Sequence, residues 1–249
     1  MTDTVGAAAQ PLFREIGQAQ AEPMPPFLPA RRLATVFTVG AALKIVFSIA
    51  LIVCMLLRLK VMDDMNRLGP LLASTLQADQ HRVNSFARLS SELASAVGLF
   101  CFVVGGMWIY RAARNIRALG ARGLSISPGW AVGFYAVPIA AWFLPLAAMS
   151  EIWRASFWPD RWRSQPMPPL LAFWWAGWIG NGLISTASSV FNRTMRLSAR
   201  NVIFSNELAL VGQALGIVAT CLFLAIVWQV TRAQQANRQQ AQQVADTFA

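Results

Sequence analysis

The sequence predicts an all-α polytopic membrane protein with four transmembrane helices and a proline-broken segment that is re-entrant or interfacial. Only 13% of the 249 residues are charged, whereas a soluble domain carries about 25%. The apolar residues form long continuous runs and not the short alternating strands of a β-barrel. Because lipid offers no hydrogen-bond partner to an exposed backbone, such runs are expected to fold as helices.

Four apolar runs are predicted to cross about 30 Å of hydrocarbon. They cover about residues 33–57, 93–110, 170–190 and 208–230, within a membrane domain of residues 31–231. Residues 1–30, rich in Ala, Gln and Pro, are predicted to form a flexible cytoplasmic tail. Residues 232–249 are rich in glutamine and are predicted to form a polar C-terminal tail.

A fifth apolar run, about residues 128–156, is interrupted by Pro138 and Pro145. Each proline removes a backbone donor and disfavours helix at the preceding residue. The distribution of Lys and Arg outside the spans also bears on whether this run crosses, because cytoplasmic loops are enriched in both. With five spans, ten basic residues fall on each side; with four, twelve fall on the N-terminal side and eight opposite. The sequence therefore favours four spans with a cytoplasmic N-terminus, and five spans remain the alternative.

The run from Tyr110 to Ser156, "YRAARNIRALGARGLSISPGWAVGFYAVPIAAWFLPLAAMSEIWRAS", resembles the bacterial DUF4328 family of uncharacterised membrane proteins. The later "LLAFWWAGWIGNGL" is similar to the span that follows in that family, and the resemblance covers about residues 89–230. It implies a multi-pass helical module of the bacterial inner membrane with no established activity.

The sequence departs from the family pattern between and after the two prolines. The family commonly places Asn, a basic residue, Tyr and Gln where this chain has Ala141, Leu144, Leu146 and Ala147. If the family uses those polar groups to bind a ligand, this member has lost them. If they only hold the segment at the membrane surface, this member is expected to lie deeper.

Lys44 falls near the middle of the first span, where a charge costs a few kcal/mol and usually faces a partner or a cavity. Glu92 and Glu207, which flank later spans, are its candidate partners. An ion or proton relay is one interpretation. A lysine that snorkels or makes one structural ion pair is the favoured one, because relays need several titratable groups within the membrane.

Two spans carry small or polar residues on one face. Asn181, Ser185 and Ser188 share a face of their predicted helix, which is expected to turn toward protein and could line a polar pathway. Gly212 and Gly216 form a small-xxx-small pattern that predicts close helix packing.

Two groups near the ends of spans are candidates for docking lipid or a protein partner. Glu151 and Arg154, spaced i,i+3, are expected to pair on one helix face and to form an interfacial anchor with Trp153. The second group is a run of arginines without an acid that can attract anionic lipids and determine topology: Arg111, Arg114, Arg117 and Arg122.

The sequence predicts neither a catalytic set nor a metal site or cofactor. The only histidine, His81, is expected in a loop, and the three cysteines are dispersed in apolar runs. No phosphate-binding glycine loop or nucleophile motif occurs. The net charge of +10 is attributed to loops that flank spans, with anionic lipids and not nucleic acid as the expected partner.

The predicted function is therefore non-enzymatic: an accessory subunit or scaffold that binds lipids, other membrane subunits or a second copy of itself. The alternative is a small transporter or channel-like protein that uses Lys44 and the polar face of the Asn181 helix. A membrane enzyme ranks third, because the acid–base or nucleophilic side chains that it requires are not apparent.

Overall fold

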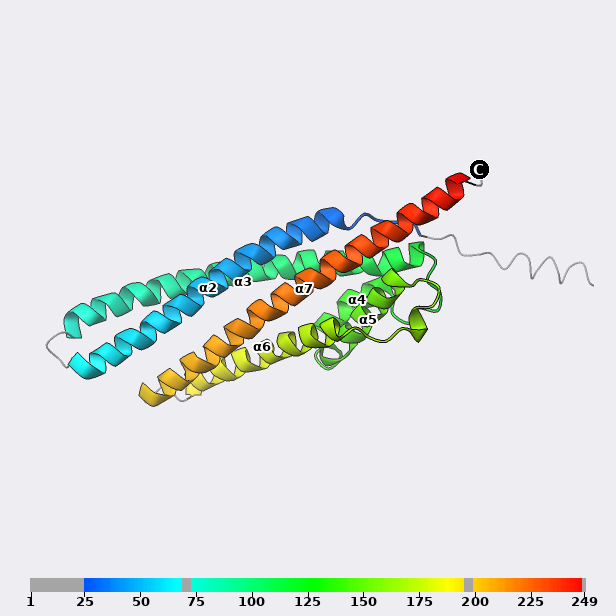
Figure 1. Cartoon of the computed structure of the whole chain (residues 1–249). Helices are drawn as coiled ribbons and strands as arrows, with labels where there is room; N and C mark the ends of the chain where they lie inside the picture. The colour runs from blue at the N-terminus through cyan, green and yellow to red at the C-terminus, as the bar shows by residue number, and fades with distance from the viewer. Residues whose placement is uncertain (1–24, 69–72, 195–198, 248–249) are drawn as a thin grey trace, which may run out of the picture.

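The computed structural model describes residues 25–68, 73–194 and 199–247, and these residues contain helices and loops but no strand. This confirms the predicted all-α class. Each predicted span lies within one of four long helices that run roughly side by side (Figure 1). These helices are α2 (Arg31–Leu68), α3 (Ala73–Ala118), α6 (Pro169–Thr194) and α7 (Ala199–Thr247).

Three helical stretches are long and apolar enough to cross a membrane: Arg31–Val61, Gln77–Ala118 and Ile203–Thr247. They support the membrane class. The fourth long helix, α6, is not among them, because its tryptophans, glycines and hydroxyl side chains lower its mean hydropathy. A count of four spans therefore stays a prediction.

The α3 helix ends in a glycine cap that turns the chain back toward the bundle. Gly120 has a φ of 85°, a conformation that glycine adopts without steric cost. Its N–H donates to the carbonyl of Arg117 at 3.0 Å, and the N–H of Ala121 donates to Ile116 at 3.0 Å. This pair of bonds is the Schellman arrangement, which satisfies carbonyls that the helix end leaves free.

The proline-broken segment consists of short helices at the end of the bundle where α3 ends and α6 begins (Figure 1). Ser127 caps the first, Pro138 lies in the break between two 3-10 turns, and Pro145 lies in the first turn of the last helix. Pro145 thus begins a helix, where its missing N–H has no cost, and does not interrupt one. The pieces are α4 (Pro128–Gly133), η2 (Phe134–Ala136), η3 (Ala140–Trp142), α5 (Leu144–Phe157) and, after it, η4 (Trp162–Ser164).

The segment dips beside α3 and returns to the same end of the bundle. The ring of Tyr135 packs edge-on against Phe102, with centroids 6.1 Å apart. Phe102 precedes Tyr110 by eight residues, about 12 Å along the helix. The segment then returns past α6, where Trp175 Nε1 donates to the carbonyl of Trp142 at 3.2 Å. The segment therefore begins and ends at one end of the bundle (Figure 1).

A buried network of amides and hydroxyls fixes that returning chain to α3 and α7. Asn115 Nδ2 donates to Gln234 Oε1 at 3.1 Å, and Gln234 Nε2 donates to Ser156 Oγ at 2.9 Å and to the carbonyl of Ala112 at 3.0 Å. Asn237 adds a bond from its Nδ2 to the carbonyl of Ser156 at 2.7 Å. One layer of polar bonds therefore joins α3, α5 and α7.

The structure describes part of each predicted tail and shows it in contact with the helical bundle. Leu28 bonds through its N–H and its carbonyl to the Asn115 side chain, so residues 25–30 are docked on α3. The α7 helix continues to Thr247, and Gln234 in the predicted polar tail is 1% exposed. The remainder of the predicted N-terminal tail, residues 1–24, lies outside the described residues.

Replacement of Gln234 by alanine is expected to destabilise the fold. It removes the acceptor of one Asn115 N–H and a donor to Ser156 Oγ, and each buried polar group left unsatisfied costs about 1–3 kcal/mol. We expect the Tm in detergent to fall by several degrees, as measured by intrinsic tryptophan fluorescence. Gln239→Ala, which removes an exposed amide from the same helix, should leave the Tm unchanged. Equal effects of the two changes would contradict a structural role for the network.

Candidate functional site

A cleft lies between the long helices. It has a volume of 740 Å³ and is lined from α2, α3, α6 and α7, with α4 and η2 closing part of one wall. That volume is in the range of small-molecule sites, roughly 300–1,000 Å³. Most of the lining is apolar and includes an aromatic group of Phe37, Phe102, Trp174, Trp178 and Phe223.

Lys44 reaches this cleft from α2. Its Nζ donates to Thr220 Oγ1 at 3.3 Å, and Thr220 donates in turn to the carbonyl of Gly216 at 2.7 Å. An ammonium carries three donors, so one hydroxyl acceptor leaves two for other groups. Lys44 is therefore a cation attached to α7 by a single hydrogen bond.

Asn181 lines the same cleft from α6. Ser185 donates to its Oδ1 at 3.4 Å, and a Cβ placed on Gly216 would come within 3.2 Å of that oxygen. The absence of a side chain at Gly216 thus lets Asn181 approach α7, as the small-residue pattern predicts. The structure brings Lys44 and Asn181, which the sequence places on separate spans, to the same cleft.

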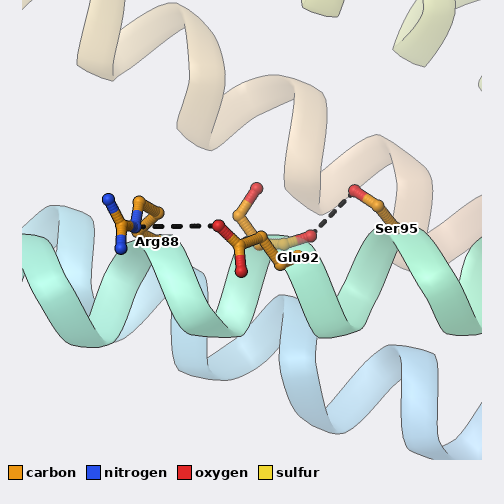
Figure 2. Close-up of polar contacts among 4 residues, drawn as sticks. Arg88, Glu92 and Ser95 are labelled. Carbon is orange, nitrogen blue, oxygen red and sulfur yellow. Dashed lines mark hydrogen bonds and ion pairs between the residues drawn. The ribbon is translucent and has the colours of Figure 1, made fainter.

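The predicted carboxylate partners of Lys44 lie elsewhere. Glu92 pairs with Arg88 on its own helix at 3.6 Å, and both side chains are exposed. Figure 2 shows this pair beside Ser95, whose hydroxyl donates to the carbonyl of Ser91 at 2.8 Å. Glu207 is exposed near the start of α7. Among the described residues Lys44 makes no ion pair, so the predicted pairing is wrong.

Tyr135 adds a second polar group to the cleft wall. It lies in η2 and packs edge-on against Phe102 and Trp178. Its hydroxyl is buried and has no hydrogen-bond partner within the described residues. Buried hydroxyls are normally paired, so this one marks a position where a ligand or an ordered water can supply an acceptor.

The four arginines of the predicted basic cluster have different surroundings. Arg117 donates to the carbonyls of Ala113 and Ile126, which holds the loop after α3. Arg111 donates to the carbonyl of Pro29 at 3.0 Å and lines one end of the cleft. Arg114 is half-buried and Arg122 is exposed.

Glu151 and Arg154 do not form the predicted ion pair. Glu151 is 5% exposed and its two oxygens accept the N–H groups of Ser125 and Ile126, at 2.9 and 3.2 Å. Arg154 instead donates to the carbonyl of Gln165 at 3.2 Å. The reason is that two free backbone N–H groups of a loop donate charge-assisted hydrogen bonds to the carboxylate, one to each oxygen.

Trp153 is also not an interfacial anchor. Its side chain is 6% exposed and stacks on Phe157, with ring centroids 5.0 Å apart. Glu151 and Trp153 therefore hold the fold together, and Glu151 and Arg154 both line a second pocket.

Several important residues were missed from the sequence. Asn115 and Ser156 occur inside the quoted motif but look like ordinary polar residues among arginines and tryptophans. Thr220 is a single hydroxyl in an apolar run, four residues after Gly216. The only signal in the sequence for Thr220 is its spacing of one helical turn from Gly216. Of the four positions that depart from the family pattern, Leu146 and Ala147 line a second pocket beside Glu151.

No metal-binding group of three or more His, Cys, Asp or Glu side chains occurs within the described residues. Cys54 and Cys101 are buried free thiols, and Cys221 is an exposed one. The cleft is lined, among those residues, by neither histidine nor carboxylate.

Comparisons with known proteins agree with the resemblance seen in the sequence. The family model described as "Domain of unknown function (DUF4328)" matches residues 74–232, from α3 to the membrane-capable part of α7. No curated protein and no solved structure matches the chain. The matched region holds all of the broken segment and most of the cleft, and covers well over half of the residues. The chain belongs to the DUF4328 family.

Proposed function

We propose that α2, α3, α6 and α7 all cross the bacterial inner membrane and that both termini are cytoplasmic. The 26 residues of α6 measure about 39 Å, enough to span the hydrocarbon, and α6 packs along α7. The broken segment begins and ends at the same end of the bundle, which supports an even number of spans. That arrangement also places twelve of the basic residues on one side.

Within this topology the protein acts as a non-enzymatic binding scaffold that holds an amphipathic molecule from the bilayer. The observation that supports this function is Lys44 in an apolar cleft of 740 Å³, where one hydroxyl is its hydrogen-bond partner among the described residues. A cation at the centre of a span costs several kcal/mol unless an anion or water compensates it. A bound anion would supply that compensation.

The lining of the cleft indicates the chemistry of the molecule. Lys44, Arg111 and the Tyr135 hydroxyl all offer donors, Asn181 and Thr220 add an amide and a hydroxyl, and most of the remaining wall is aromatic or aliphatic. From Gly98 to Arg111 the cleft follows α3 for about 20 Å. A single-chain amphiphile with a carboxylate fits this shape and polarity, with its chain against the aromatic group.

A second candidate function is transport of such a weak acid through the cleft. It is favoured by one observation, the convergence of Lys44 and Asn181 from different helices on the same cavity. A scaffold keeps its ligand, whereas a transporter must release it on both sides.

The topology is tested by cysteine labelling in a variant without the native cysteines. A cysteine at Arg161, in the loop before α6, and one at Gln242, in the last part of α7, should react only from the cytoplasmic side. A cysteine at Asp63 should react only from the periplasm. Reaction of the Arg161 position from the periplasm would show that residues 128–156 cross the membrane.

Ligand binding is tested with a photo-reactive fatty acid and its methyl ester, which differ only in charge. The acid should label α3 and α6 of the purified protein, and the ester should label them much less. Lys44→Met should reduce labelling by the acid about tenfold, the value of one charge-assisted hydrogen bond. Lys60→Met, which removes an exposed lysine from the same helix, is the control. Equal labelling by acid and ester in the unmodified protein would exclude an anionic ligand.

Transport is tested by weak-acid flux into proteoliposomes. The transporter predicts that Lys44→Ala and Asn181→Ala both abolish a flux that the unmodified protein supports, while assembly in detergent is unchanged. A protein that labels with the fatty acid but gives no flux above empty liposomes is a scaffold and not a carrier.

A further inference from the structure

A second pocket, separate from the cleft, lies on the outer face of α5. It has a volume of 540 Å³. One wall is a single face of α5, and the opposite wall comes from the loop after α3 and from the chain around η4. The α5 residues recur at helical spacing, so the pocket is a groove that follows the helix axis. They are Phe143, Leu146, Ala147, Ser150, Glu151 and Arg154.

The polarity of this groove changes from one end to the other. At its beginning Phe143 is 71% exposed and Leu146 and Ala147 are apolar. At its far end, about 16 Å along the helix, are Arg154 and Arg163. An apolar end and a cationic end at this separation match a lipid that enters from the bilayer.

The two arginines both lie over the ring of one tryptophan. Each guanidinium lies 5.4 Å from the Trp162 ring centroid. The Trp162 ring is itself fixed, because its Nε1 donates to the carbonyl of Arg122 at 3.0 Å. Arg163 also donates to the carbonyl of Gly123, whose φ of 66° and missing side chain leave room for the guanidinium.

Both arginines keep donors that the described residues do not use. Arg154 bonds through Nε and Nη1 to two carbonyls, and Arg163 bonds through Nη2 to one. Arg154 Nη2 and Arg163 Nε and Nη1 remain. Planar guanidinium donors of this kind bind phosphate oxygens well.

The one acid in the groove does not cancel this charge. Glu151 is buried, and its oxygens accept the amides of Ser125 and Ile126. Arg117 donates to the carbonyl of the same Ile126. The Glu151 carboxylate is therefore compensated by the loop amides and does not pair with Arg154 or Arg163. The end of the groove at these two arginines stays positive.

We propose that this groove binds one anionic glycerophospholipid of the surrounding bilayer, with its phosphate at Arg154 and Arg163. One acyl chain lies along Phe143, Leu146 and Ala147. The site differs from the cleft, to which none of these residues contributes. The proposal rests on the membrane placement given above and not on the fatty-acid ligand.

The test is native mass spectrometry of the full chain in neutral detergent, titrated with phosphatidylglycerol or with zwitterionic phosphatidylcholine. The first phosphatidylglycerol should bind more tightly than phosphatidylcholine. Arg163→Ala should weaken phosphatidylglycerol about fivefold and change phosphatidylcholine little. Arg161→Ala is the matched control, because Arg161 is an exposed arginine in the same loop that does not line the groove. Ala147→Trp, which fills the apolar end at an exposed position, should weaken both lipids.

Each other result overturns the proposal. Equal losses in Arg163→Ala and Arg161→Ala would mean diffuse attraction to a basic surface. Unchanged binding in Ala147→Trp would mean that no acyl chain occupies the groove. Displacement of the lipid by millimolar inorganic phosphate would assign the arginines to a soluble anion. The measurement is made in detergent, so a wrong topology or an empty cleft would not change its outcome.

Discussion

The buried side-chain amide of Asn115 is the centre of the network that joins the N-terminal residues, α5 and α7 to α3. This side chain bonds to both backbone groups of Leu28 and to Gln234, which in turn bonds to Ser156. A buried amide can be satisfied in only a few geometries, so such a network has one arrangement where an apolar contact would allow several. It fixes the end of α5 against α3 and α7, and therefore the place where the broken segment returns.

The broken segment contributes a wall to both proposed sites. Its early part brings Tyr135 into the cleft beside Phe102 and Trp178, and its later part forms the floor of the α5 groove. Glu151 and Arg117 hold the preceding loop from both sides of Ile126. Many polar residues of the family-like motif therefore hold the loop and the broken segment in place. This structural role explains them without a chemical activity shared by the family.

The sequence predicted the helices and the break because both depend on local properties: the length of an apolar run and the missing N–H of proline. It could not predict the partner of Glu151, since backbone amides of a distant loop leave no mark in the side-chain pattern. It predicted a carboxylate as the partner of Lys44 because opposite charges can be recognised in a sequence. The hydrogen-bond partner in the structure is the hydroxyl of Thr220. Gln234 was placed in a tail because glutamine reads as polar, and its burial follows only from tertiary contact.

The low hydropathy of α6 is compatible with a span for a physical reason. Its exposed surface carries Phe173, Leu183 and Val190, while Trp174 and Trp175 are buried. The hydroxyls on its exposed side donate to carbonyls one turn earlier, as Thr186 does to Gly182 and Ser189 to Ser185. A hydroxyl satisfied within its own helix costs little in lipid, and Asn181 faces the cleft. An average over all residues counts these groups as polar, although the membrane would meet mainly apolar atoms.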